Sequence, residues 1–237
     1  MPKFSVIIPA RNEEKFLPGC LASIAVASEP FPGEVEIVVA INRCTDRTEE
    51  IARAAGATIV HEEARNIARI RNAAVQAASG EILVTIDADS RMSRGMLVMV
   101  EQLLRTGTYI GGGVMIWPER WSLGIAATAF VLLPFAIKHR VSGGLFWCRR
   151  DDFWAIGEFD ERRISVEDLD FANRLKAYGK AKRKPFKTIW KEHIVTSCRK
   201  FDQFGDWYLV LNPGFVRRIF SGRSQPDADL FYYDVKR

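Results

Sequence analysis

Short apolar runs and helix-like stretches alternate along the first part of the chain. The apolar runs, which are typical of buried strands, lie at residues 4–8, 36–41, 57–60 and 81–86. Between them, apolar positions recur at helical spacing after Pro18, over 47–55 and over 66–78. Strands that alternate with helices in this way predict an α/β fold, with a mostly parallel sheet and helices on both of its faces.

The second part of the chain has a different character. Three glycines at 111–113 precede a long apolar segment, 122–137, and a strand is predicted at 143–147. No linker, low-complexity tract or repeat separates the two parts. We therefore expect one continuous domain over residues 1–237, in which residues 224–237 form a loosely attached tail.

The apolar segment 122–137 falls short of the ~18 apolar residues that a membrane-spanning helix needs. We therefore predict that it is buried within the protein. Its flanks, Trp121 and the basic residues 138–140, also fit a helix that lies on a bilayer surface. Shallow membrane contact and contact with a second subunit, in a homodimer, are the alternatives.

Composition narrows the setting in which the protein works. The 237 residues are 48% hydrophobic, enough for a full core, and the four cysteines form no C-x-x-C pair. Scattered cysteines, and an N-terminal apolar run too short for a signal peptide, predict a cytoplasmic protein or one bound peripherally at the inner face of the membrane.

Basic residues are concentrated at 176–187, in a chain with a net charge of +5. Such a run is usually a solvated face. No nucleic-acid motif accompanies it, so we expect no nucleic-acid partner. Phosphate-bearing substrates and anionic lipid head groups are equally good partners for the run.

Polar residues follow each of the four predicted strands. Asp87 and Asp89 come directly after the fourth strand, and the others lie at 9–13, 42–43 and 61–62. Ligands of open α/β sheets bind beyond the carboxyl ends of the strands, so these residues are expected to converge on one site. If residues 87–89 were extended, both carboxylates would point the same way and favour a cation between them. A plain polar turn is the alternative.

A second acidic cluster opens a predicted helix in the second half of the chain. Ser165 and Asp168 have the spacing of a capping box, which would be a purely structural role. A cap needs only one acid, whereas Glu167, Asp168 and Asp170 occur together. We therefore favour a chemical role, because an ionised carboxylate at a helix N-terminus can accept a proton from a hydroxyl group.

His193 and Arg199 lie further along, after a predicted strand at 186–190. We expect His193 to meet the first acidic pair as a metal ligand, although a lone histidine is most often structural. Arg199 suits a diphosphate, since a guanidinium group binds phosphate in bidentate fashion.

Five motifs occur in a characteristic order: VIIPARNEE at 6–14, CTDRT at 44–48, RNAA at 71–74, DAD at 87–89 and ED at 167–168. In this order they resemble the family 2 glycosyltransferases, over most of residues 4–201. The resemblance implies the GT-A fold, with a Rossmann-like nucleotide-binding half (1–110) fused to an acceptor-binding half (111–223). It also implies a nucleotide-sugar donor, a divalent metal (Mn or Mg) and inversion of the anomeric centre.

The resemblance further implies roles for individual residues, which join His193 and Arg199 in one expected site. Asp168 would be the general base, and Glu167 would lie beside it in the acceptor site, where we also expect Trp147. Asp89 would hold the metal together with His193. The expected donor-binding residues are Pro9, Arg11, Glu13, Asn42, Arg71, Asp87 and Arg199. The acceptor would offer a hydroxyl group on a glycan, a lipid-linked sugar or a small molecule.

Some features depart from the family pattern or suggest rivals. Ile41 stands where many members have an acid, and the Q-x-x-R-W signature of processive synthases is absent, which favours single additions. A nucleotidyltransferase would more typically have a glycine-rich loop where this chain has residues 9–13. A non-catalytic binding module would have no need of Asp87, Asp89 and Asp168 together.

Overall fold

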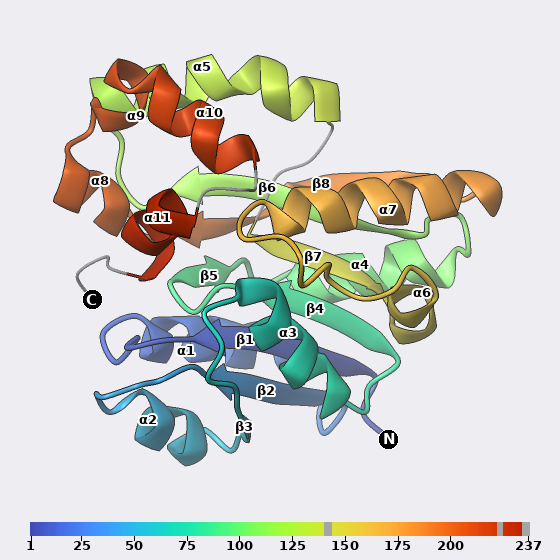
Figure 1. The fold of residues 1–237 in the computed structure, drawn as a ribbon. Coiled ribbons are helices and arrows are strands. Elements are labelled where there is room, and N and C mark those ends of the chain that lie inside the picture. Colours follow the sequence, from blue (N-terminus) through green and yellow to red (C-terminus); the bar gives the residue numbers. More distant parts are fainter. Residues whose placement is uncertain (140–143, 222–224, 234–237) are drawn as a thin grey trace.

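The computed structural model describes residues 1–139, 144–221 and 225–233, and these form one sheet packed between helices (Figure 1). The strands are β1 (Phe4–Ala10), β2 (Val35–Ile41), β3 (Thr58–His61), β4 (Ile82–Ile86), β5 (Ser90–Met92), β6 (Gly111–Pro118), β7 (Leu145–Arg149) and β8 (Phe186–Thr196). They lie in the order β3-β2-β1-β4-β7-β6-β8-β5. β7 is antiparallel to both of its neighbours and β5 to β8, while the other pairs are parallel.

Helices cover both faces of the sheet. One apolar core lies under α1 (Leu17–Ser28), α2 (Thr48–Ala54) and α4 (Met96–Arg105). The second core lies under α3 (Ile67–Gln76), α6 (Arg150–Ala155) and α7 (Glu167–Ala181). The α/β architecture predicted from the alternating pattern is therefore confirmed.

The remaining helices gather above and to the left of the sheet in Figure 1. They are α5 (Leu123–His139), α8 (Arg199–Phe204), α9 (Tyr208–Leu211), α10 (Pro213–Ser221), α11 (Gln225–Ala228) and the π-helix η1 (Asp229–Tyr233). None of the helices in the described ranges combines the length and the apolar character that a bilayer crossing requires.

The apolar segment 122–137 is a helix, but the prediction that it is buried is wrong for one side of it, among the side chains that the structure describes. Only one side of α5 is covered, through Ile125 and Thr128, which are 3% and 5% exposed. On the other side Leu123 is 81% exposed and Phe130 76%. The segment is long enough to be a core helix, yet it packs at the margin of the molecule with one side exposed (Figure 1).

The prediction of a loose tail at 224–237 is also wrong over 225–233, the part of it that the structure describes. Phe231 of η1 packs against Phe204 and Phe215, with ring centroids 6.1 and 5.5 Å apart. Asp227 of α11 accepts two hydrogen bonds from Arg218 at 2.8 and 3.2 Å. Aromatic packing and this ion pair together hold the segment against α8 and α10.

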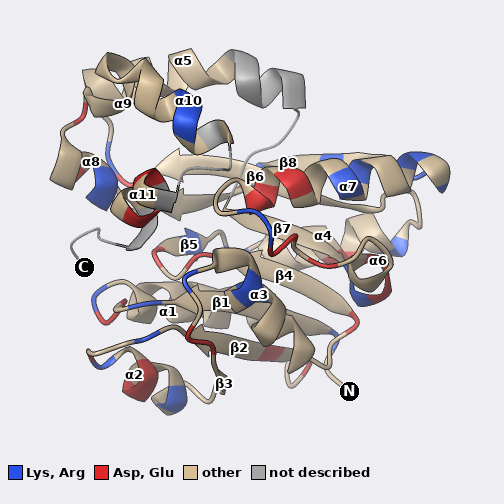
Figure 2. Ribbon diagram, viewed as in Figure 1, with Lys and Arg blue, Asp and Glu red and all other residues tan. Residues whose placement is uncertain are grey.

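The basic run 176–187 begins in the second half of α7 and continues into β8. Figure 2 shows acidic residues at the first turn of α7 and basic residues toward its far end. A helix rises about 1.5 Å per residue, so roughly 20 Å separate the two ends of α7. Most of the basic run therefore lies toward the end of α7 that is far from the acidic cluster of residues 167–170.

Candidate active site

A cavity of about 280 Å³ lies beyond the carboxyl ends of β1, β2 and β4, where the two halves of the chain meet. The first turns of α3, α7 and α8 close it from the other sides. Its lining residues are Pro9, Ala10, Arg11, Glu13, Asn42, Ile67, Ile70, Arg71, Asp87, Ala88, Asp89, Glu167, Asp168, Thr196, Ser197, Arg199, Lys200 and Phe201. The pocket thus brings together ten of the twelve residues that the sequence analysis singled out.

Asp87 and Asp89 lie in a turn directly after β4, in which the backbone N–H of Ser90 donates to the carbonyl of Asp87 at 3.0 Å. The chain is therefore not extended here, and the polar-turn interpretation is correct for the backbone. The carboxylates face different partners. Asp87 pairs with Arg71 at 2.7 Å, and Asp89 with Arg199 at 3.0 Å. Each carboxylate is thus paired with a different guanidinium group, and each guanidinium group also binds a second acid, Glu167 or Glu13.

Arg71 joins the two halves of the site. It extends from α3, is 6% exposed, and donates one hydrogen bond to Asp87 and a second to Glu167 at the start of α7. Burial raises the pKa of Glu167 to about 7, against the lowering effect of Arg71. Burial thus makes Glu167 keep its proton to a higher pH than an exposed glutamate would.

Asp168 lies in the first turn of α7 and does not act as part of a capping box. Its Oδ1 accepts a hydrogen bond from the backbone N–H of Leu169 at 2.7 Å, while the hydroxyl of Ser165 donates to the carbonyl of Ile219 at 2.7 Å. Val166 precedes the helix in the left-handed conformation, with φ of 54°. Burial raises the pKa of Asp168, with Arg71 opposing the rise. A higher pKa makes this carboxylate a better proton acceptor.

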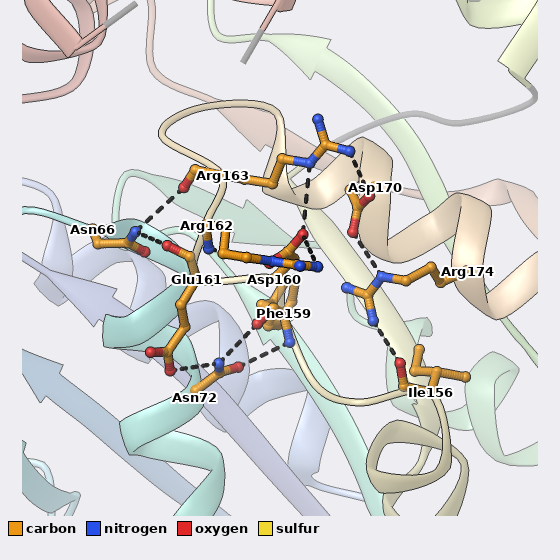
Figure 3. Close-up of polar contacts among 10 residues, drawn as sticks. All are labelled: Asn66, Asn72, Ile156, Phe159, Asp160, Glu161, Arg162, Arg163, Asp170 and Arg174. Atoms are coloured by element: carbon orange, nitrogen blue, oxygen red, sulfur yellow. Dashed lines mark hydrogen bonds and ion pairs between the residues drawn. The ribbon is translucent and has the colours of Figure 1, made fainter. Parts of the chain in front are cut away.

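The loop that leads into α7 is fixed to α3 by polar contacts (Figure 3). Asn72 donates to the carbonyl of Phe159 and accepts from its N–H, both at 3.0 Å. Asn66 donates to the carbonyl of Glu161 at 2.6 Å and to that of Arg163 at 3.3 Å. Because α3 also carries Arg71, one helix positions the start of α7 and holds its first acid.

Asn42 follows β2 and is 1% exposed. Its Nδ2 donates to the carbonyls of Glu62 and Ala64 at 2.5 and 2.9 Å, which fixes the orientation of the amide. Its Oδ1 has no hydrogen-bond partner in the described part of the chain. A buried acceptor without a partner is costly, so this atom is available to an N–H group of a ligand.

Trp147 is not at the pocket. It lies in the middle of the sheet in β7, is 0% exposed, and its Nε1 donates to the carbonyl of Gly113 at 3.3 Å. A Cβ on Gly112 would lie 2.5 Å from the indole ring, so this glycine of β6 makes room for the side chain. The expectation that Trp147 binds acceptor is therefore corrected to a role in the core.

His193 is not brought to the pocket either. β8 extends to Thr196 rather than ending at 190, because a bulge interrupts its register with β6 after the pair Val114 and Ile189. His193 consequently lies within the strand, with its ring 6.2 Å from that of Trp117. The residues that reach the pocket from β8 begin at Thr196. The expectation that His193 joins Asp89 at a metal is thus not supported by its position.

Several lining residues were not singled out from the sequence: Ile67, Ile70, Thr196, Ser197, Lys200 and Phe201. The polar ones lie beside Arg199, so the Ser-Cys-Arg-Lys run at 197–200 was the signal for them. Ile67 and Ile70 carry no comparable signal, because apolar residues on a helix normally indicate core packing.

A divalent metal of the kind that the family resemblance implies would need oxygen ligands, which Mg and Mn prefer. Asp87 and Asp89 supply such oxygens at the pocket. Among the described residues, no three or more His, Cys, Asp or Glu side chains are grouped so that they could hold a metal on their own. Asp87 and Asp89 therefore fit a metal whose other ligands are oxygens of a bound diphosphate. Among the described residues, they do not form a complete metal site by themselves.

We expect Arg71→Met to lower the free energy of unfolding by about 3–5 kcal/mol, because it removes one member of a buried ion pair and leaves Glu167 without its partner. Urea unfolding monitored by circular dichroism measures the loss. The double variant Arg71→Met, Glu167→Gln should regain a large part of it, since no buried charge remains. An unchanged unfolding midpoint in the single variant would contradict the role given to Arg71.

Comparison with known proteins supports one family. The model of "Glycosyl transferase family 2" matches residues 5–157. The glycosyltransferase AglE of Haloferax volcanii is 31% identical over 220 residues, which cover 87% of this chain and 69% of that protein. A TPR repeat-containing protein of Synechococcus elongatus is 33% identical over 93 residues, which cover 39% of this chain and 22% of that protein.

Solved structures share the fold. A mannosyltransferase from Pyrobaculum calidifontis, in complex with GDP-Man and Mn²⁺, superposes with a TM-score of 0.66 at 22% identity. The match covers 95% of this chain and 66% of that one. The chain therefore spans only part of the length of the proteins that it matches.

Proposed function

Because the chain belongs to glycosyltransferase family 2, we propose that its pocket binds a nucleotide-sugar and transfers the sugar, with inversion, to a hydroxyl group of an acceptor. The observation that supports this best is that Asp168 lines the same cavity as Asp87 and Asp89. One acid with a raised pKa thus comes together with two acids that are paired with arginines. A base for the acceptor and a charged binding site for a diphosphate are the two requirements of this reaction.

In the proposed reaction the acceptor oxygen forms a bond to the anomeric carbon as the bond from that carbon to the diphosphate oxygen breaks. Asp168 takes the hydroxyl proton, and the nucleoside diphosphate leaves with the bonding electrons. Attack on the side opposite the leaving group inverts the anomeric centre. Arg71 keeps Glu167 in place beside the base.

The donor lies, in this proposal, along the ends of β1, β2 and β4. Pro9, Arg11 and Asn42 line the part that would take the nucleoside, and Asn42 offers its unpartnered Oδ1 to the base. Asp87 and Asp89 would hold a metal bound to the diphosphate, which supplies positive charge to the leaving group. Arg199 and Lys200 add cationic side chains on the same side of the pocket.

A donor panel tests the proposal. UDP-, GDP- and dTDP-sugars with Mn²⁺ are screened by thermal shift, and the donor that binds the folded protein should raise the unfolding midpoint by mass action. The same donor should then give a glycosylated product with inverted configuration, read by NMR. The proposal fails if no nucleotide-sugar stabilises the protein.

The exposed side of α5 supports a membrane partner within the same proposal. Leu123, Phe130, Val131 and Leu133 are all at least 48% exposed, and neither α5 nor α10 contains an acidic residue. An exposed apolar helix side with no acidic residue in α5 or α10 suits the surface of an anionic bilayer. A peripheral position of this kind would bring the pocket to a lipid-linked acceptor.

We expect the protein to co-sediment with phosphatidylcholine vesicles that contain phosphatidylglycerol, and added salt should weaken the binding. The variant Phe130→Glu, Val131→Glu should lower the bound fraction more than ~10-fold, because each large apolar side chain contributes about 1.5–3 kcal/mol on burial. Val26→Glu, at an apolar residue of α1 that is 40% exposed, is the control and should bind as before. Loss of a dimer in the double variant, without vesicle binding by the wild type, would identify α5 as a homodimer surface instead.

A further inference from the structure

The guanidinium group of Arg199 lies between two carboxylates of the pocket. Its Nη1 donates to both carboxylate oxygens of Glu13 at 2.9 and 2.7 Å, and its Nη2 lies 3.0 Å from Oδ2 of Asp89. The side chains are largely buried: Arg199 is 14% exposed, Glu13 4% and Asp89 11%. The ring of Phe16 lies 5.3 Å from the guanidinium carbon and covers its face. The cation is therefore held firmly at this position.

The same contacts occupy one of the two carboxylate oxygens of Asp89. Oδ2 of Asp89 receives the hydroxyl of Ser197 at 2.8 Å in addition to Arg199. A second cation placed on this oxygen would lie against the guanidinium group, and like charges repel strongly in a poorly hydrated site. Burial opposes the charged form of Arg199, but Asp89 and Glu13 keep its pKa above the usual value, so the repulsion persists at every working pH.

A bound diphosphate would compete with Glu13 and Asp89 for the guanidinium group of Arg199. Its Nε has no hydrogen-bond partner within the described residues, so its contacts with Glu13 and Asp89 use only part of the donor set. A phosphate group accepts two parallel hydrogen bonds from a guanidinium group. Arg199 lines the cavity in which the diphosphate would lie.

We propose that Arg199 is a resident cation that blocks Asp89 to divalent metal until a nucleoside diphosphate draws the guanidinium group away. The proposal builds on the nucleotide-sugar function proposed above. Metal and diphosphate then bind cooperatively: the diphosphate frees Asp89 for the metal, and by linkage the metal favours the diphosphate equally. Arg199 is thus a positioning residue, which acts on metal binding through Asp89.

The test measures Mn²⁺ binding in the absence of nucleotide, by the electron paramagnetic resonance signal of free Mn²⁺. Arg199→Met should bind Mn²⁺ at least ~10-fold more tightly than the wild type, a typical size for coupling between two sites. Arg199→Lys, which keeps the charge, should remain close to the wild type. Arg120→Met is the matched control, because Arg120 also bridges two carboxylates, those of Asp202 and Asp206, but on the surface. It should leave Mn²⁺ affinity unchanged.

A second titration adds UDP or GDP. In the wild type the nucleotide should tighten Mn²⁺ binding, and in Arg199→Met this gain should shrink. Equal Mn²⁺ affinity in the wild type and in Arg199→Met, without nucleotide, overturns the inference even if nucleotides bind as proposed.

If Arg199→Met does not fold, Arg199→Gln, which can still donate to Glu13, takes its place with the same expected result. Failure of every nucleotide to bind the wild type would count against the proposed function, and the titration with metal alone keeps the two failures apart.

Discussion

Asp168→Asn should lower turnover by about 10²–10⁴-fold, the usual contribution of a general base, while the protein still folds and binds its donor. The amide cannot take the acceptor proton, but its oxygen can still accept the hydrogen bond from the N–H of Leu169. Turnover is measured with the donor that gives the largest thermal shift, and donor affinity by calorimetry.

Asp170→Asn is the matched control for Asp168. Asp170 lies on the same helix, but it is bound to Arg163 and Arg174 at 3.3 and 2.6 Å, so its carboxylate is already in use. This variant should lose some stability and keep most of its turnover. A folded Asp168→Asn protein with full transferase activity would remove Asp168 as the base.

Asp89→Ala should weaken Mn²⁺-dependent nucleotide binding by more than ~100-fold. Loss of a residue that only hydrogen-bonds to a metal ligand costs ~10–100-fold, and loss of the ligand itself should cost more. The fold should survive, because the polar partners of this side chain among the described residues are Ser197 and Arg199, and the backbone carbonyl of Asp89 still accepts from the N–H of Ser197. Calorimetric titration of UDP and GDP, with and without Mn²⁺, measures the effect.

The control for Asp89 is Asp202→Ala, which removes a carboxylate that pairs with Arg120 and is 59% exposed. It should leave the metal dependence of nucleotide binding intact. Unchanged metal dependence in Asp89→Ala itself would show that the metal, if it binds, does so elsewhere.

Local sequence patterns were sufficient to predict the strands and helices of the nucleotide-binding half. Its strands and helices are short and regular, and the carboxyl ends of parallel strands meet at one edge of a sheet, so Asp87 and Asn42 could be placed near one another without coordinates. Arg71 and Asp168 could be placed with them only through the family resemblance. Their contacts depend on the packing of α3 against α7, which no local pattern encodes.

The failures have a common origin in long-range packing. His193 was expected after the end of its strand, but β8 continues past a bulge to Thr196, so His193 lies three residues before the strand ends. A bulge depends on the neighbouring strand and cannot be predicted from the strand alone. Trp147 belongs to the core because Gly112 of β6 leaves space for its ring. The apolar side of α5 could not be assigned to core or surface, since apolar composition is the same in both cases.

Val166, which enters α7 in the left-handed conformation, has a consequence for the evolution of the protein. A β-branched residue in this conformation costs about 1–3 kcal/mol, a cost that folded proteins retain mainly at functional sites. Val166 directly precedes Glu167 and Asp168, so the strained backbone lies next to the two acids of the candidate site. Selection for stability alone would favour glycine at position 166, because glycine adopts this conformation without strain. Selection for catalysis would favour valine, because valine restricts the backbone next to Glu167 and Asp168 more than glycine does. We therefore expect Val166→Gly to raise stability and lower activity.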